Sequence, residues 1–304
     1  MRIAFVKTFF DLAKKDKNIV LVTGDLGFSI FEDFIKELPK QYLNAGVAEQ
    51  NMTGVAAGMA LEGKIPFIYS IVPFITMRNF EQIKNDICYQ NLNVKIVGVG
   101  GGFSYGIYGH THYGLEDVGI LRTLPGMTIL VPGDPREAEE ATRAALKIKG
   151  PVYIKLGKAG EPVVHKDNFK FEVGKGIIVK KGSDIALVAC GTMLPIAMQA
   201  SDILREKFSV SVVSMPTIKP LDEKLVSDLG KSMKGIFTLE EHSKLGGLGS
   251  AVAEVLAENR LNPIFKRFGS QDRFNKVTGS QSFMREQNGL SPEEIVKEIT
   301  SFFQ

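Results

Sequence analysis

This chain of 304 residues contains little cysteine, little net charge and no long apolar run, and each absence excludes a class of protein. Its two cysteines, Cys88 and Cys190, lie within apolar segments, so we expect buried thiols rather than a disulfide or a pair of metal ligands. A net charge of +3 without any run of lysine and arginine argues against a nucleic-acid partner. No apolar run is long enough to span a membrane and the first residues lack the pattern of a signal peptide, so we expect a cytoplasmic protein with no membrane partner.

Signatures of nucleotide and metal sites are also missing. The segment Gly98–Gly102 follows an apolar strand but does not lead directly into a helix, as a dinucleotide-binding turn must. The sequence has no phosphate loop of the P-loop type. His110 and His112 are the only closely spaced histidines, and alternate side chains of an extended segment point to opposite sides, so we expect no metal site. One of the two rings could still act as a proton donor near neutral pH.

Apolar strand patterns alternate with amphipathic helix patterns along the whole chain, which is typical of parallel sheets flanked by helices. The pattern predicts strands at 19–22, 65–70, 94–99, 127–131, 152–156, 184–190, 210–214, 235–239 and 264–268, and helices at 3–15, 74–91, 115–123, 134–148 and from Ser291 onward. The stretch 157–183 is rich in glycine and lysine and reads as a connection with a short hairpin. The sequence therefore predicts an α/β protein of two domains, residues 1–165 and 166–304, each built on a mainly parallel sheet.

One acidic residue lies in an unusual helix. The segment 44–63 (NAGVAEQNMTGVAAGMALEG) places Glu49 at the start of a predicted helix built largely from small residues, which allow another backbone or a flat ring to approach closely. Glu49 is either a first-turn charge favoured by the helix dipole or a group that handles protons at an interface. The pattern alone leaves both interpretations open.

Two further segments carry candidate side chains. Tyr105, Tyr108 and Tyr113 lie in the glycine-rich stretch 98–114 beside the two histidines, and long loops of this kind are common at functional sites. Phe74, Met77 and Phe80 recur at helical spacing, as in a core, although the same stripe could form a wall for a flat heterocycle.

Several of these segments together resemble the transketolase family. Gly24–Gly27, the Glu49 helix and Gly109–His112 match its pyrimidine-binding domain in order and spacing, and Thr217–Asp222 and Glu240–Ala251 resemble its C-terminal domain. The resemblance covers nearly the whole chain and implies the C-terminal half of a split transketolase. The synthase of 1-deoxyxylulose 5-phosphate and the beta subunits of 2-oxoacid dehydrogenases share this layout.

The resemblance also implies a partner. In transketolases a separate domain with a Gly-Asp-Gly motif and a later Asn holds the diphosphate of thiamine diphosphate and its Mg²⁺, and this sequence has no such motif. We therefore expect an N-terminal subunit that supplies the diphosphate and metal site, in an α2β2 heterotetramer.

Roles for individual residues follow from the same resemblance. Glu49 matches the glutamate that hydrogen-bonds the cofactor's aminopyrimidine and activates the cofactor, which makes it the first catalytic residue. Phe74 corresponds to the aromatic that packs on that ring, while Met77 and Asp25 are also assigned to the cofactor site. His112 matches the family's substrate histidine and is the second catalytic residue.

The substrate residues depart from the family pattern. Arg2 and Lys158 fall near positions that bind the substrate phosphate, and His110 belongs to the substrate segment. Tyr108 replaces the aspartate that reads the C2 hydroxyl of the donor, and Gly100 stands where a second substrate histidine is expected. We therefore expect an unusual donor or acceptor, such as pyruvate as an acyl donor or a modified or nucleotide-linked sugar acceptor.

The implied activity is transfer of a two-carbon ketol or acyl unit from a ketose phosphate or 2-oxoacid donor to an aldehyde or sugar acceptor. Two alternatives stay open: a decarboxylating 2-oxoacid dehydrogenase of the beta type and a non-catalytic assembly partner. Thr111-His112 and Thr217–Asp222 favour the transketolase, and the carboxylate of Glu49 favours catalysis. We expect His242 to be structural or to lie at an interface, and assign no catalytic residue to the C-terminal domain.

Overall fold

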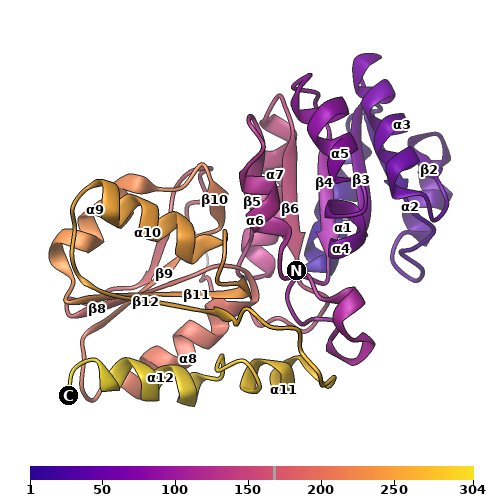
Figure 1. Ribbon diagram of the computed structural model, residues 1–304. Helices are drawn as coiled ribbons and strands as arrows, with labels where there is room; N and C mark the ends of the chain where they lie inside the picture. The colour runs from indigo at the N-terminus through magenta and orange to yellow at the C-terminus, as the bar shows by residue number, and fades with distance from the viewer. Residues whose placement is uncertain (167–168) are drawn as a thin grey trace.

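Two sheets lie side by side in the computed structural model, which describes residues 1–166 and 169–304 (Figure 1). The first sheet has seven strands in the order β10-β5-β6-β4-β3-β1-β2, and only β10 runs antiparallel to its neighbour. The second has five strands in the order β12-β11-β8-β9-β7, with β7 antiparallel. The strands are β1 Ile19–Thr23, β2 Tyr42–Asn44, β3 Ile65–Ile71, β4 Lys95–Val99, β5 Thr128–Leu130, β6 Val152–Leu156, β7 Ile177–Lys180, β8 Ile185–Ala189, β9 Val210–Ser214, β10 Thr217–Lys219, β11 Gly235–Ser243 and β12 Ile264–Ser270.

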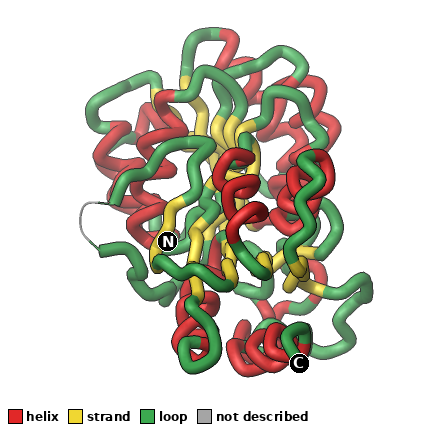
Figure 2. Tube along the Cα trace, turned by 90° about the vertical axis from the view of Figure 1, so that its left-hand side faces the viewer, coloured by secondary structure: helices red, strands yellow, loops and turns green. Residues whose placement is uncertain are grey.

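Helices cover both faces of each sheet, and Figure 2 shows the strands enclosed between them. The helices are α1 Arg2–Ala13, α2 Glu32–Glu37, α3 Glu49–Leu61, α4 Val72–Thr76, α5 Phe80–Gln82, α6 Asp117–Arg122, α7 Pro135–Lys147, α8 Leu194–Leu204, α9 Glu223–Ser232, α10 Leu248–Glu258, α11 Gln281–Glu286 and α12 Pro292–Ser301. In the first domain α1 and α7 pack on one face, and α3 and α6 on the other. In the second, α8 and α12 lie opposite α9 and α10 (Figure 1).

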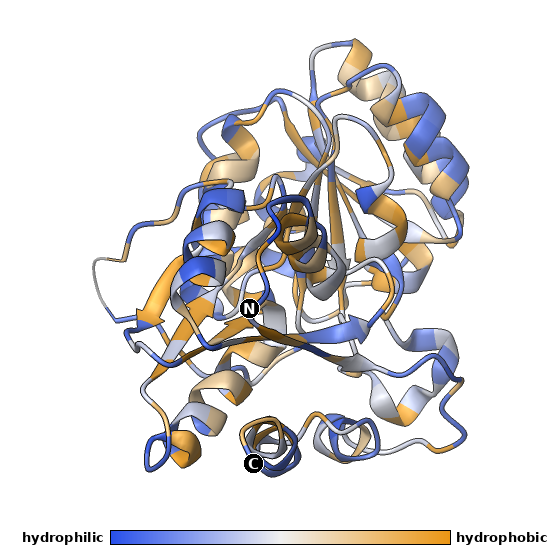
Figure 3. Ribbon diagram, turned by 60° about the vertical axis from the view of Figure 1, so that its left-hand side comes forward, coloured by the Kyte–Doolittle hydropathy of each residue, from blue (hydrophilic) through white to orange (hydrophobic). Residues whose placement is uncertain are grey.

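The cores follow from the strand composition. Every residue of β1, β4, β6, β8 and β9 is buried, as expected for parallel strands covered on both faces. In Figure 3 much of the hydrophobic colour lies in the interior of the molecule, while the hydrophilic colour is prominent on the outer helices and loops. One apolar cluster combines side chains of both domains, including Met127 and Val131 of the first and Val213 and Met215 of the second. The two domains therefore share a core rather than meeting only at a polar surface.

Most predicted elements are confirmed, including the α/β class and the mainly parallel sheets. The final helix begins as expected, with the Ser291 hydroxyl accepting the Glu294 amide at 3.3 Å. Cys88 and Cys190 are free and buried, and burial raises the pKa of both thiols, that of Cys88 to about 11. Among the described residues, no helix combines the length and apolarity that a bilayer crossing requires.

Three local predictions are wrong. The helix expected at 74–91 is interrupted after α4 and continues through α5 into a π-helical turn at Ile83–Cys88. The described part of 157–183 forms no hairpin and contributes only β7, which pairs with β9 instead (residues 167 and 168 lie outside the described part). His110–His112 forms a 3₁₀ turn rather than an extended segment.

The strand β10 was not expected from the sequence. It follows the second domain's β9 but pairs with β5 and thus completes the edge of the first sheet. Three residues are too short for a periodic signal, and the strand is defined by a partner far away in the chain. The domain boundary at residue 165 stays a prediction. The strand β10 lies after this boundary in the sequence but belongs to the first sheet.

A buried ion pair lies where the chain leaves the first domain. His165 Nε2 lies 2.5 Å from Glu137 Oε1, its ring stacks on Phe169, and its backbone amide donates to Asp134. Burial alone would lower the pKa of His165, but the hydrogen bond and charge of Glu137, with the charge of Asp134, outweigh burial and raise it. The protonated imidazole is therefore favoured in the folded chain.

This shift gives a pH-dependent contribution to stability. Since the folded pKa of His165 exceeds the unfolded value of about 6.5, the contribution is fully present below that value and is lost as pH rises through the folded pKa. In urea unfolding, the difference in unfolding free energy between wild type and His165→Gln should be larger at pH 6 than at pH 9. A difference that is constant or grows with pH would contradict the assigned direction.

Candidate active site

Glu49 is a buried carboxylate at the start of α3. The preceding turn depends on Asn44, whose Oδ1 accepts the backbone amides of Asp25 and Gly46 at 3.0 Å each. Gly46 has a φ of +74°, which redirects the chain into the helix. The side chain of Glu49 is only 1% exposed, and its Oε1 accepts the Ser70 hydroxyl at 3.3 Å. The fold thus places an acid among apolar strands and a helix of small residues.

Arg78 supplies the countercharge, and sequence reasoning missed it. Its Nη1 lies 2.8 Å from Glu49 Oε2, and its guanidinium lies over the Phe74 ring, 4.3 Å from the centroid. Arg78 lies in the turn that follows α4, where its neighbour Asn79 donates to the Thr53 hydroxyl at 2.6 Å. Phe74 and Arg78 are four residues apart, so helical spacing alone would have placed them on one face.

An aromatic cluster adjoins Phe74. The His112 ring lies 5.2 Å from Phe74 and 5.2 Å from Tyr108, with Tyr105 at 6.3 Å. Burial lowers the pKa of His112, so its imidazole is neutral at physiological pH and can donate or accept a hydrogen bond. Its Nδ1 lies 3.0 Å from the Thr111 hydroxyl, which fixes the ring orientation. The structure therefore brings Glu49, Phe74 and His112 into one chain of contacts through Arg78.

Two cationic side chains lie next to Tyr105. Lys158 Nζ is 4.9 Å from the centre of the Tyr105 ring, and Arg2 lies beside the hydroxyls of Tyr69 and Tyr105. Burial raises the pKa of both phenols, and the Arg2 charge opposes this effect. Arg2 Nε is buried without an acceptor among the described residues. Both cations therefore lie next to Tyr105.

Tyr105 also explains why glycine occupies position 100. Gly100 has a φ of +79°, a conformation that side chains rarely adopt, and the Tyr105 ring packs directly against its α-carbon. A histidine at this position would collide with the ring. The aromatic ring therefore fills the place that the family resemblance gives to a second substrate histidine.

The remaining candidates lie outside the series of contacts that joins Glu49, Arg78, Phe74 and His112. His110 is exposed and packs edge-on against Phe274 at 4.6 Å, so its ring faces the second domain, away from the His112 cluster. Asp25 is exposed and its Oδ1 accepts the Asn44 side-chain amide at 3.0 Å. Met77 is 39% exposed at the end of α4. Within the described residues, no group of three or more His, Cys, Asp or Glu side chains is arranged to hold a metal ion.

A buried polar network supports the segment that carries His112. Asp117, at the start of α6, lies 2.8 Å from Lys155 Nζ and accepts the Tyr153 hydroxyl at 2.6 Å. Lys155 also donates to the Gly114 carbonyl at 2.9 Å. Burial, followed by the charge of Asp117, raises the pKa of Tyr153 well above its usual value, so the phenol stays a donor.

Comparison with known families accounts for both domains. The family model described as "Transketolase, pyrimidine binding domain" matches residues 1–160, and the one described as "Transketolase, C-terminal domain" matches residues 174–295. The chain belongs to the transketolase family. Within it, the chain resembles subunits of split enzymes along its whole length.

Two such relatives are named as transketolase subunits. The chain is 39% identical to a subunit of the apulose-4-phosphate transketolase of Phocaeicola vulgatus, over 99% of this chain and 96% of that protein. It is 36% identical to a subunit of the 6-deoxy-6-sulfo-D-fructose transketolase of Clostridium sp., over 98% of this chain and 92% of that protein. A solved split-gene transketolase, described as an inactive beta4 tetramer, superposes with a TM-score of 0.88 at 37% identity, covering 98% of this chain and 96% of its own.

The transketolase family uses thiamine diphosphate, and the residues around Glu49 suit its aminopyrimidine ring. The Arg78 guanidinium is a planar cation that lies over the Phe74 ring and hydrogen-bonds Glu49, so a flat group that makes both contacts fits this place. A Cβ added to Gly24 would lie 3.5 Å from Glu49 Oε1, so glycine keeps that side of the carboxylate open. The carboxylate and the ring can therefore hold a flat, hydrogen-bonding heterocycle.

Proposed function

We propose that this chain is the pyrimidine-binding subunit of a thiamine-diphosphate-dependent transketolase. The observation that carries this proposal is the buried Glu49 carboxylate, paired with a planar cation that stacks on Phe74. When bound, thiamine diphosphate supplies the carbon nucleophile that attacks a carbonyl group and breaks the adjacent carbon–carbon bond. Glu49 holds and exchanges a proton with the ring nitrogen of the aminopyrimidine, and Phe74 fixes the plane of that ring.

The substrate side of the site lies around His112. The neutral imidazole of His112 orients and hydrogen-bonds the donor, with Tyr108 beside it. Arg2 and Lys158 bind the phosphate of the substrate, with the buried Nε of Arg2 as one donor. The reaction transfers a two-carbon ketol or acyl unit from a ketose phosphate or 2-oxoacid to an aldehyde or sugar. The two named relatives act on unusual sugars according to their names, which favours a modified sugar substrate here, consistent with Tyr108 in place of aspartate.

The partner in this proposal is an N-terminal transketolase-like subunit that carries the diphosphate and Mg²⁺ site, in an α2β2 assembly. Relatives of the same length are named as subunits, which supports a second chain. This sequence also lacks the Gly-Asp-Gly motif. Asp25 and Met77 are exposed, and Met77 directly follows the helix that carries Phe74, so in this proposal they contact the cofactor and the partner.

Reconstitution tests the proposal. The chain should bind thiamine diphosphate in the presence of Mg²⁺ only when mixed with its N-terminal subunit, as measured by isothermal titration calorimetry. Phe74→Ala should weaken this binding by about tenfold, because it removes the ring face. Equal affinity of the chain alone, or sugar turnover without the cofactor, would overturn the proposal. Turnover of xylulose 5-phosphate and ribose 5-phosphate at ordinary transketolase rates would contradict the prediction that the donor or acceptor is unusual.

A further inference from the structure

A loop of the first domain carries the proposed substrate residues, and the second domain holds it. Residues 101–114, called the substrate loop below, are closed at their base by a bridge in which Gly102 and Gly114 exchange two backbone hydrogen bonds of 3.0 Å. Between these ends the loop carries Tyr105, Tyr108 and His112. A loop with this much glycine loses considerable conformational entropy when it is ordered, so it needs contacts that fix it.

The strongest of these contacts comes from Glu241 on β11. Its Oε1 accepts the backbone amide of Phe103 in the loop at 2.6 Å. Gly102, beside it, has a φ of +64°, and a Cβ there would lie 2.5 Å from Glu241 Cγ. Gln281 on α11 donates to both carboxylate oxygens at 3.0 Å and to the Ser104 hydroxyl of the loop at 3.3 Å. The loop backbone at Gly102 and Phe103 thus packs closely against the Glu241 side chain of the second domain.

Glu241 is itself held rigidly as an anion. Its Oε2 accepts the Thr192 hydroxyl at 2.6 Å and Arg285 Nη2 at 2.7 Å, and the residue is only 5% exposed. Burial alone would raise the pKa of this carboxyl, but Arg285 and the hydrogen-bond donors hold it below its usual range. Hydrogen bonds to an ionised acceptor are about twice as strong as neutral ones. A charged, fully bonded carboxylate is therefore a firm support for the Phe103 amide.

We propose that Glu241 is a positioning residue of the transketolase site: from the C-terminal domain it fixes the substrate loop and so sets the place of His112 and Tyr108. This inference rests on the proposed function of the loop, but the anchoring itself does not. Glu49 and Phe74 lie outside the loop, on α3 and α4. Loss of the Glu241 contact should therefore impair donor handling and leave cofactor binding intact.

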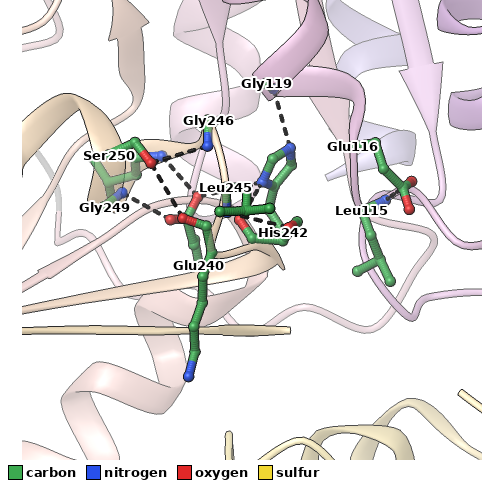
Figure 4. A network of polar contacts seen from close by, with 12 residues as sticks. Leu115, Glu116, Gly119, Glu240, His242, Leu245, Gly246, Gly249 and Ser250 are labelled. Carbon is green, nitrogen blue, oxygen red and sulfur yellow. Dashed lines mark hydrogen bonds and ion pairs between the residues drawn. The ribbon is translucent and has the colours of Figure 1, made fainter. Parts of the chain in front are cut away.

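The neighbouring residue Glu240 provides a matched control. It is 1% exposed, and its carboxylate accepts the amides of Leu248 and Gly249 at 2.7 and 2.8 Å, which caps α10 within the second domain. Figure 4 shows this cap and, beside it, His242, whose Nε2 accepts the Gly119 amide of α6 at 3.1 Å. Glu240 contacts no residue of the substrate loop by a hydrogen bond among the described residues. Glu240→Gln therefore disturbs an equally buried carboxylate without releasing the loop.

The first test measures anchoring in the isolated chain. In Glu241→Gln, an amide N–H₂ replaces an oxygen that faces only donors, so the Phe103 amide should exchange with deuterium at least tenfold faster than in wild type. Glu240→Gln should leave the exchange of loop 101–114 unchanged. Gln281→Ala, which alters only a half-buried residue of α11, should speed loop exchange by about two- to fivefold and keeps the test decisive if Glu241→Gln does not fold. Unchanged loop exchange in folded Glu241→Gln would overturn the proposal.

The second test measures positioning in the enzyme reconstituted with its N-terminal subunit. Glu241→Gln should lower kcat/KM for the donor by about 10- to 100-fold, the effect of misplacing a contact by around 1 Å. Its Kd for thiamine diphosphate should stay within about twofold of wild type. Equal losses in Glu241→Gln and Glu240→Gln, or a parallel loss of cofactor affinity, would reduce Glu241 to a structural role. An inactive wild-type assembly would instead contradict the proposed function. The deuterium exchange of the substrate loop would still show whether Glu241 anchors it.

Discussion

Replacing Glu49 with glutamine should lower the kcat of the reconstituted enzyme by about 100- to 10,000-fold, the usual contribution of a general acid–base group. The amide keeps the volume of the side chain and can still accept the Ser70 hydroxyl, but it cannot take up or return a proton. Arg78, which is 44% exposed, can turn to water when its partner loses the charge. The isolated chain should therefore stay folded, and the measurement is steady-state kinetics at saturating cofactor.

A second glutamate on the same helix serves as the control. Glu62 is the exposed C-cap of α3, and Glu62→Gln should leave kcat unchanged. Deuterium exchange at the thiazolium carbon of bound cofactor separates loss of proton handling from loss of substrate binding, and Glu49→Gln alone should slow it. Full activity in Glu49→Gln would remove the proposed catalytic role.

Asp117→Asn should destabilise the folded chain by about 3–5 kcal/mol, because it leaves a buried ammonium without its anion. Asp117 is fully buried and Lys155 is 7% exposed, and their charged atoms lie 2.8 Å apart. The Gly114 carbonyl and the Tyr153 hydroxyl cannot replace the lost charge. Urea unfolding of the chain measures the change in unfolding free energy.

The double variant Asp117→Asn/Lys155→Met tests whether the loss of stability comes from the unpaired charge of Lys155. Removing both charges should recover much of the stability lost in Asp117→Asn, since no unpaired ion is then buried. The exposed pair Lys224 and Asp228 on α9 provides the comparison, and Asp228→Asn should leave stability unchanged. Strictly additive effects of the two buried substitutions would show that the ion pair is not coupled.

The sequence was sufficient for the architecture because parallel strands buried on both faces give continuous apolar runs, and these alternated regularly with helical patterns. It was insufficient where an element depends on distant partners. The strand β10 is defined by pairing with β5, and the turn after α4 interrupts a helix that local spacing favours. Neither feature leaves a periodic signal.

In the candidate site, too, some residues could be predicted from the sequence and others depend on distant contacts. The resemblance selected Glu49, Phe74 and His112, and the structure places them in one series of contacts, although their roles stay predictions. The contact between Arg78 and Glu49 could not be predicted from the sequence, because Arg78 lies in the turn after α4 rather than in a helix. Glu241 escaped notice because its partner Phe103 is 138 positions away, and no spacing rule relates residues on different domains.

The pairing of Arg78 with Glu49 has a thermodynamic consequence for any ligand of this carboxylate. A cationic or hydrogen-bonding ring that stacks on Phe74 must take the place of a guanidinium that already makes both contacts. Its measured affinity is therefore the difference between two competing interactions, and strengthening the internal pair would weaken binding. Without a ligand, the Arg78 guanidinium compensates the buried Glu49 carboxylate, so the interior does not contain an unpaired charge.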